Sequence, residues 1–140
     1  MVSFDKGYNP LRWDCEKNGC FNVKRRPKIE MFSECFPGKI NFGDVDGIVE
    51  LNGFALMLEW KSSMRGDLKA EQRIMYERIT KDKKITVILI VGDAETMVCE
   101  SYSLFFGGKH TDRVKADLDA IKKRIRSWVI WAQKKNNGQT

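Results

Sequence analysis

Histidine and closely spaced cysteines are scarce in this chain of 140 residues. It has one histidine, His110, and four cysteines, at positions 15, 20, 35 and 99. No two of the cysteines have the C-x-x-C spacing that is typical of zinc sites. We therefore expect reduced thiols and no structural zinc, as in a cytoplasmic protein.

Long apolar runs are also missing. No stretch approaches the roughly 20 apolar residues of a membrane span, and the first six residues lack the apolar core of a signal peptide. The content of 42% hydrophobic and 31% charged residues is typical of one soluble globular domain. The net charge of +6 favours a polyanionic partner without requiring one, because a modest excess of lysine is common on protein surfaces.

A tight turn is the strongest local signal in the sequence. Asn52-Gly53 separates two runs in which apolar and polar residues alternate, Gly43–Leu51 and Phe54–Lys61. Asn-Gly between alternating runs is typical of a two-residue β-hairpin, because both residues tolerate a positive φ angle. The pattern therefore predicts two antiparallel strands.

The register of this hairpin brings charged residues together. If the two residues that flank the turn pair with each other, Asp46 lies directly opposite Glu59. Asp44 then lies opposite Lys61, and all four side chains point to one face. The other face is predicted to face the core: Val45, Val49, Leu51, Phe54, Leu56, Leu58 and Trp60.

Asp46 and Glu59 are a poor pair for stability alone, because like charges directly opposite on a sheet destabilise it. A divalent cation reverses that effect, since Mg²⁺ binds one or two carboxylates together with phosphate oxygens of a substrate. Lys61 would add a positive charge beside a phosphate or an attacking water. The alternative is a solvated face on which Lys61 pairs with Asp44.

These residues resemble the signature of the PD-(D/E)XK nuclease superfamily, an acidic residue on one strand and (D/E)-x-K on the next. Asp46 matches the first acid, and Glu59-Trp60-Lys61 matches the second part. Val45 stands where the signature has proline. The combination of hairpin register, spacing, following helix and following strand is more specific than (D/E)-x-K alone.

Two further patterns extend the resemblance over roughly residues 40–92. Gln72 and Tyr76 resemble the Q-x-x-x-Y element of several branches, and the run 43–46 is similar to the G-x-P-D entry of the VRR-NUC branch. The size of the chain also resembles that of small Holliday junction resolvases, which would cut branched DNA as homodimers. A compact nuclease of this kind suggests a phage or mobile element acting in a bacterial cytoplasm.

The resemblance implies an α/β (α+β) fold of the restriction-endonuclease-like type. Its mixed central sheet of about four strands would be flanked by helices, in the order α-β-β-α-β-β-α. Within a single domain, residues 1–42 would be irregular or helical, 43–104 the catalytic core and 111–135 a C-terminal helix. Local patterns predict helices over 11–18 and, as an option, 28–36. They also predict a helix over about 68–81, capped by Asp67, with an apolar stripe of Leu68, Ile74 or Met75, and Ile79. A buried parallel strand over 85–91, a strand over 96–104 near a sheet edge, and a long helix capped by Thr111 with Val114 first in its apolar stripe complete the prediction.

The implied activity is Mg²⁺-dependent hydrolysis of nucleic-acid phosphodiester bonds, with DNA as the expected substrate and Mn²⁺ as a substitute ion. Asp46, Glu59 and the backbone carbonyl of Trp60 would be metal ligands, and Lys61 would orient water or offset charge. Asp44 would bind a second metal or hold Lys61.

A third acidic ligand is expected on the first helix of the family. Glu16 is the first candidate, and Glu30 and Glu34 are its rivals.

Several residues are candidates for contacts to nucleic acid. Gln72 and Tyr76 lie one helical turn apart and would contact DNA or orient a metal-bound water, unless Tyr76 packs the helix and Gln72 faces solvent. The basic candidates are Lys24, Arg25, Arg26, Lys28 and Arg65. Two alternative functions are possible for a chain with the same fold. One is a catalytically inactive module that binds nucleic acid, and the other is a protein that inhibits another protein.

Overall fold

The computed structural model describes residues 27–62 and 68–135 in two compact units, Met1–Gly43 and Asp44–Thr140. In the described part of the first unit, a 3₁₀ helix, η1 (Ile29–Cys35), falls within the optional helix 28–36. The ring of Phe42 makes edge-to-face contacts with Phe32 and Phe36, at centroid distances of 6.1 and 5.2 Å. The predicted helix over 11–18 lies outside the described residues.

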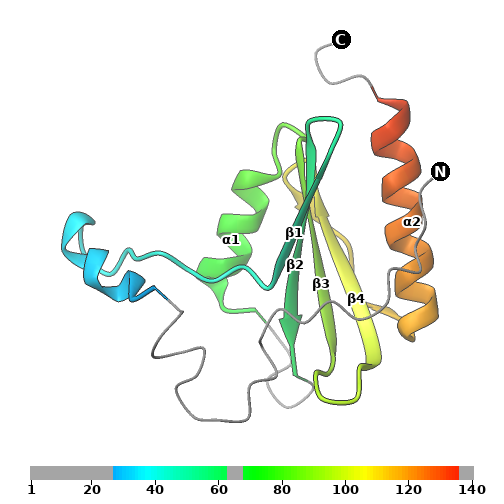
Figure 1. Cartoon of the computed structure of the whole chain (residues 1–140), viewed down its shortest axis with the longest axis horizontal. Coiled ribbons are helices and arrows are strands. Elements are labelled where there is room, and N and C mark those ends of the chain that lie inside the picture. The colour runs from blue at the N-terminus through cyan, green and yellow to red at the C-terminus, as the bar shows by residue number, and fades with distance from the viewer. Residues whose placement is uncertain (1–26, 63–67, 136–140) are drawn as a thin grey trace. The chain divides into compact units, whose positions relative to one another are not determined.

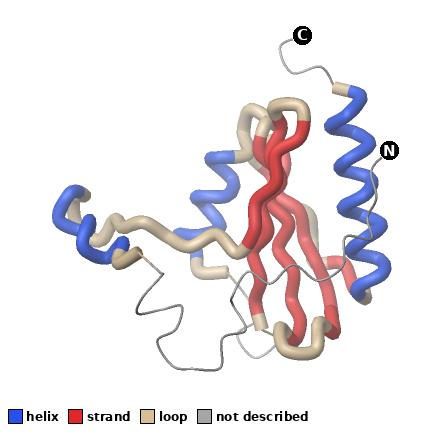
Figure 2. The backbone as a smooth tube through the Cα atoms, in the orientation of Figure 1, coloured by secondary structure: helices blue, strands red, loops and turns tan. Residues whose placement is uncertain are grey.

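The second unit is a mixed α+β structure around an open, mostly antiparallel six-stranded sheet (Figures 1 and 2). The strand order is β1-β2-β3-β4-β5, and β6 also pairs with β4. Only the β2–β3 pair is parallel among the described strands. The elements are β1 (Gly47–Leu51), β2 (Phe54–Lys61), α1 (Ala70–Ile79), β3 (Ile85–Asp93), β4 (Val98–Phe106), β5 (Lys109–His110), β6 (Val114–Lys115) and α2 (Leu118–Lys134).

The hairpin forms with the predicted turn and register. Asn52 and Gly53 have φ angles of 57° and 86°, as a two-residue turn of this type requires. Leu51 pairs with Phe54, and the pairing continues to Gly47 opposite Leu58. The strand β1 is shorter than predicted, because it begins at Gly47 rather than Gly43.

The predicted core face of the hairpin is only partly correct. Phe54 and Leu56 are buried, but Val45 and Val49 are 47% and 50% exposed. The reason is that β1 is an edge strand with β2 as its only neighbour in the sheet. Among the helices, α2 reaches β1 with only a few contacts, and Leu51 packs against the core there.

The connection from β2 through α1 to β3 joins two parallel strands, as predicted. The residues Val87 to Val91 are all at most 4% exposed, so β3 is buried on both faces. Such strands read as continuous apolar runs, which is why the run over 85–91 was recognisable in the sequence.

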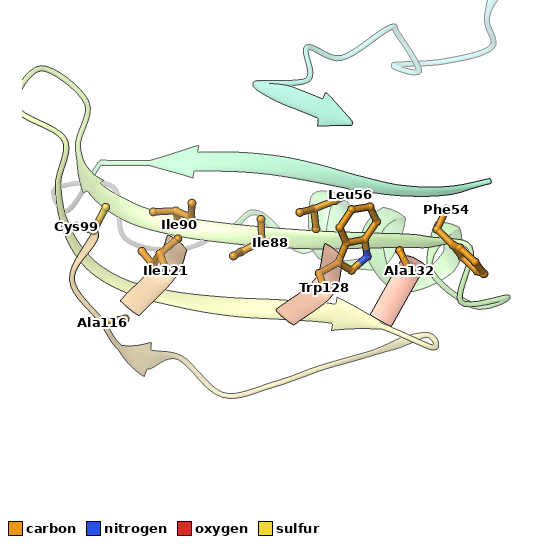
Figure 3. Close-up of a cluster of buried hydrophobic side chains, with 9 residues drawn as sticks. All are labelled: Phe54, Leu56, Ile88, Ile90, Cys99, Ala116, Ile121, Trp128 and Ala132. Atoms are coloured by element: carbon orange, nitrogen blue, oxygen red, sulfur yellow. The ribbon is translucent and has the colours of Figure 1, made fainter. Parts of the chain in front are cut away.

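The two helices cover opposite faces of the sheet (Figure 1). On one face α2 contributes Ile121, Trp128 and Ala132 to the core, and Figure 3 shows these side chains along β2 and β3. The opposite face carries a smaller cluster built on Tyr76 of α1, with Val87, Leu89 and Phe105 of the sheet.

The start of the C-terminal helix was predicted wrongly. α2 begins at Leu118, and its N-cap is Asp117, whose side chain accepts a hydrogen bond from the Ala120 amide (2.9 Å). Thr111 instead accepts a hydrogen bond through Oγ1 from the Leu104 amide (3.0 Å). Val114 lies in β6, where it pairs with Tyr102 and is 46% exposed.

Two smaller expectations also need correction. The strand β4 is not at an edge, because β5 and β6 pair with it, which raises the strand count from about four to six. α1 is shorter than 68–81, and Ile74 and Met75 are 40% and 45% exposed, so its buried residue is Tyr76. Asp67, its predicted cap, lies outside the described residues. No helix in the described ranges has the length and apolar character needed to cross a membrane.

Candidate functional site

A buried carboxylate stands on the sheet face that α1 covers. Side chains alternate along β2, so Met57 and Glu59 point to the α1 face while Leu58 points to α2. Glu59 is only 7% exposed. A carboxylate with so little access to water is costly unless hydrogen bonds and an opposite charge satisfy it.

Both oxygens of Glu59 have a partner. Oε1 lies 3.2 Å from Nζ of Lys61, two residues further along the same strand and therefore on the same face. Oε2 accepts a hydrogen bond from the Tyr76 hydroxyl of α1 at 2.9 Å. The site thus depends on both the strand and the helix packed on it.

Asp46 contacts the residue that follows Glu59, at the open end of the hairpin. It precedes β1, and its Oδ2 accepts a hydrogen bond from the Trp60 amide at 2.6 Å. The side chain of Asp46 therefore takes the place that a backbone carbonyl of β1 would occupy next to β2. The paired residues of the hairpin end at Gly47 opposite Leu58, so the predicted direct pairs Asp46–Glu59 and Asp44–Lys61 are not part of the ladder. Asp46 instead meets the Glu59 segment through the Trp60 amide.

The backbone of Trp60 faces the same side as Asp46. The amide of Ala55 donates to the carbonyl of Lys84, which immediately precedes β3, so it points away from β1. Successive amides along a strand point to alternate sides, so the amide of Trp60, five residues later, points towards β1 and Asp46. In a strand the amide and carbonyl of one residue point to the same neighbour, so the Trp60 carbonyl also points towards the β1 side.

The hydroxyl of Tyr76 stays protonated because of its surroundings. Burial raises its pKa first, and the hydrogen bond to Glu59 and the negative charges of Glu59 and Asp46 raise it further. The ring packs edge-to-face on Phe105 at a centroid distance of 5.5 Å. Tyr76 is therefore a fixed hydrogen-bond donor to Glu59 rather than only a packing residue.

Gln72 lies one turn before Tyr76 on α1, as predicted, and is not simply in solvent. Its Oε1 is buried and has no hydrogen-bond partner in the described ranges 27–62 and 68–135. A buried amide oxygen of this kind calls for a donor, which a ligand could supply.

The structure describes four more of the predicted site residues. Asp44 begins the second unit, while Lys28, Glu30 and Glu34 are exposed residues of the first. Five predicted residues lie outside the described residues: Glu16, Lys24, Arg25, Arg26 and Arg65.

The small number of carboxylates in this cluster limits the kind of metal ion that it could bind. In the part of the chain that the structure describes, no group of three or more histidine, cysteine, aspartate or glutamate side chains could hold a metal. Asp46 and Glu59 alone provide two carboxylates, which is the number that Mg²⁺ uses when substrate phosphates complete its shell. These two carboxylates and the Trp60 carbonyl are the groups of this cluster that could hold such an ion.

An open cavity of about 430 Å³ lies next to this cluster and was not predicted. Its lining includes Arg73 of α1 and the segment from His110 to Arg113. The sequence pattern predicts a helix cap at Thr111, which instead lines this cavity. The signal that was available is the charged run His110-Thr111-Asp112-Arg113 between two short strands.

Comparisons of the chain with protein-family models, with curated proteins and with solved structures found no match.

Proposed function

We propose that this protein is a metal-dependent nuclease of the PD-(D/E)XK type, which hydrolyses phosphodiester bonds of nucleic acid, with DNA as the expected substrate. The observation that carries the proposal is a buried carboxylate, Glu59, held by Lys61 and Tyr76 at the end of a hairpin where Asp46 also lies. The positive net charge of +6 supports a polyanionic substrate.

Each residue of the cluster would have a separate role in hydrolysis. Asp46, Glu59 and the Trp60 carbonyl would hold Mg²⁺, which polarises a phosphate oxygen and lowers the pKa of a bound water. Lys61 places an ammonium group beside the carboxylates, where it offsets the charge that develops on phosphate oxygens during attack. Tyr76 keeps Glu59 in one orientation by donating to Oε2, and leaves Oε1 to Lys61 and to the metal.

The same contacts favour a second candidate function. Lys61 and Tyr76 satisfy both oxygens of Glu59 without any cation. This network also suits a module that binds nucleic acid, or inhibits another protein, with Glu59 in a structural role. The two candidates differ in whether a divalent ion matters.

The test is cleavage of linear, nicked, flapped and four-way DNA, and of RNA, in Mg²⁺ or Mn²⁺ and in EDTA. We expect cleavage with either metal and none in EDTA. Asp46→Asn, Glu59→Gln and Lys61→Ala should each lower the rate at least about a hundredfold, because each removes several kcal/mol of transition-state stabilisation.

The matched control is Glu50→Gln. Glu50 lies on the same hairpin face as Asp46, and its Oε2 accepts a hydrogen bond from the Gly53 amide, which a glutamine oxygen can also do. This variant should cleave like the wild type, and circular dichroism should show that all four variants are folded. Cleavage by Glu59→Gln at the wild-type rate, or no cleavage by the wild type on any substrate, would contradict the proposal.

Metal binding has a readout that does not require activity. Addition of Mg²⁺ should raise the melting temperature of the wild type, because an ion that binds only the folded state stabilises it. Asp46→Asn should remove most of this shift. An equal shift in this variant and in the wild type would exclude Asp46 as a ligand.

A further inference from the structure

The cavity next to the acidic pair has the chemistry of a nucleotide-binding subsite. It has a volume of about 430 Å³, within the usual range for ligand sites. Arg73, Arg113 and His110 line it together with Ser103 and Asp112. Two guanidinium groups and an aromatic ring at one concave surface suit a phosphate and a base.

The cavity is continuous with the candidate catalytic face of the sheet. Glu59 of β2 pairs with Leu89 of β3, and Leu89 pairs with Ser103 of β4. Directly paired residues point to the same face, and Leu89 and Ser103 both line the cavity. Because neighbouring strands lie about 4.8 Å apart, the cavity begins within about 10 Å of Glu59, which is about the reach of one or two nucleotides.

The imidazole of His110 is held in a fixed place. Its ring packs against Phe105 at a centroid distance of 5.3 Å and an interplanar angle of 32°. Nδ1 lies 3.4 Å from a carboxylate oxygen of Glu77 on α1. The side chain of His110 is nevertheless 40% exposed, so part of the ring remains available to a stacked base.

The two arginines come from separate elements. Arg73 lies on α1 one residue after Gln72, and Arg113 immediately precedes β6. Asp112 adds a carboxylate beside Arg113, which disfavours several phosphates in the cavity and suits a single one. This carboxylate could accept a hydrogen bond from the amino group of a base.

We propose that this cavity binds one unpaired nucleotide next to the phosphate held at Asp46 and Glu59. The guanidinium groups of Arg73 and Arg113 contact its phosphate, and the ring of His110 stacks on its base. This inference rests on the proposed nuclease function, and it defines the substrate class as single strands, flaps and overhangs rather than fully paired DNA.

The size and shape of the cavity favour an unpaired nucleotide over a duplex. A concave site of about 430 Å³ holds one splayed nucleotide, whereas a duplex presents stacked bases and phosphates over a broad convex surface. Stacking on an aromatic ring also requires a base that has left the duplex stack.

The experiment measures binding separately from cleavage. The full-length Lys61→Ala chain is used in Mg²⁺, so that labelled DNA stays intact. The probes are a single-stranded oligonucleotide, a blunt duplex, and the same duplex with a single-stranded overhang, each titrated in fluorescence anisotropy at several salt concentrations.

Arg73→Gln and Arg113→Gln should each weaken binding of the single strand and of the overhang, and lower the salt slope by about 0.7–0.9. His110→Ala should weaken the same two probes at least about fivefold, and His110→Phe should restore most of the loss. Blunt-duplex binding should not change. The matched control is Arg78→Gln, which removes an exposed arginine of α1 outside the cavity lining.

Equal losses on all three probes, or no loss on any, would overturn the proposal. Thermal unfolding of each variant shows whether a loss comes from misfolding, and His110→Phe keeps the ring even if His110→Ala is unstable. If the wild type cleaves nothing but the selective losses persist, the nuclease proposal fails and the nucleotide subsite stands. If the wild type cleaves and the cavity variants bind normally, the subsite fails alone.

Discussion

At the scale of single residues, the hydrogen bond between Tyr76 and Glu59 is the contact of the candidate site whose loss should cost the most folding free energy. The carboxylate is 7% exposed and the tyrosine 4% exposed, so each depends on the other for a hydrogen bond. Tyr76→Phe keeps the ring that packs on Phe105 but removes the hydroxyl. We expect it to lower the free energy of unfolding by about 1–3 kcal/mol, because Glu59 loses a partner in a buried place.

The raised pKa of Tyr76 gives this loss a pH dependence. In the unfolded chain the phenol ionises near its ordinary pKa of 10.0, whereas in the folded protein it ionises only at higher pH. Between these two values the folded state binds more protons, so the full stabilisation is present below pH 10 and is lost as the pH rises further. Urea unfolding at a series of alkaline pH values should show a smaller decline for Tyr76→Phe than for the wild type.

The control for this prediction is Tyr102→Phe, which removes a phenol on the opposite face of the sheet, packed with the α2 cluster. It should not reproduce the loss of unfolding free energy that Tyr76→Phe shows at neutral pH, because it leaves the hydroxyl that donates to Glu59 in place. An identical decline in Tyr76→Phe and in the wild type would contradict the assignment.

Two buried threonines allow a matched test of side-chain hydrogen bonding. Oγ1 of Thr80 donates to the Tyr76 carbonyl (2.7 Å) and accepts from the Gly108 amide (3.3 Å). Oγ1 of Thr86 is equally buried but has no hydrogen-bond partner in the described part of the chain. Thr80→Val should cost about 1–3 kcal/mol, and Thr86→Val should leave the free energy of unfolding unchanged or raise it. Equal losses in urea unfolding would contradict this.

At the scale of elements, the hairpin turn also closes the end of α2. Asn52 has a positive φ angle for the turn, and its Nδ2 donates to the carbonyls of Ala132 (3.1 Å) and Lys135. These are among the last carbonyls of the helix, which have no partner within it. One side chain therefore serves the turn and the helix end together.

Asn52→Gly separates these two roles. Glycine adopts the positive φ angle at least as well, so the hairpin should remain, but the helix end loses its donor. We expect a loss of about 1 kcal/mol and faster amide exchange in the last turn of α2, measured by hydrogen exchange. Asn52→Asp also lacks the donor and sets a negative charge against the same carbonyls, so its loss should be at least as large. Unchanged exchange in both variants would show that these bonds contribute nothing.

At the scale of the whole molecule, the core and the candidate site belong to the second unit. Both core clusters consist of residues from Leu51 onwards, and the acidic pair begins at Asp46. A chain that lacks residues 1–41 keeps every residue of both described clusters, so it should still unfold in one cooperative transition in urea.

The same truncation tests the third acidic ligand. Glu16, Glu30 and Glu34 are all removed, whereas Asp46 and Glu59 remain. If the two carboxylates suffice for Mg²⁺, the shortened chain should keep its Mg²⁺-dependent melting shift. A folded truncated chain without this shift would show that the first unit supplies a ligand. A truncated chain without a cooperative transition would contradict the prediction that the two described clusters are sufficient for folding.

The parts of the fold that the sequence predicts are those set by local physics. Asn52-Gly53 requires positive φ angles, and the alternation around it leaves one register in which Leu51 meets Phe54. The run over 85–91 is apolar on both faces and was recognised as a buried parallel strand. These features depend on neighbours a few residues away.

The errors occurred where distant segments compete for the same residues. Val114 fits the apolar stripe of the following helix, but it pairs with Tyr102 instead and forms β6. Val49 alternates correctly for a core face, but an edge strand is not covered along its whole length. Neither outcome can be read from local periodicity, because pairing and coverage involve segments that are far apart in the sequence.

The sequence by itself determined the hairpin turn and the register of its strands, because the turn conformation and the alternation of apolar residues are local properties. Only the tertiary structure decided that Glu59 is buried, that Tyr76 and Lys61 share its oxygens, and that Arg73 and His110 meet at one cavity. Those contacts join α1 to strand residues up to 37 positions away in the sequence, from Arg73 to His110, and packing across that separation exists only in the folded chain.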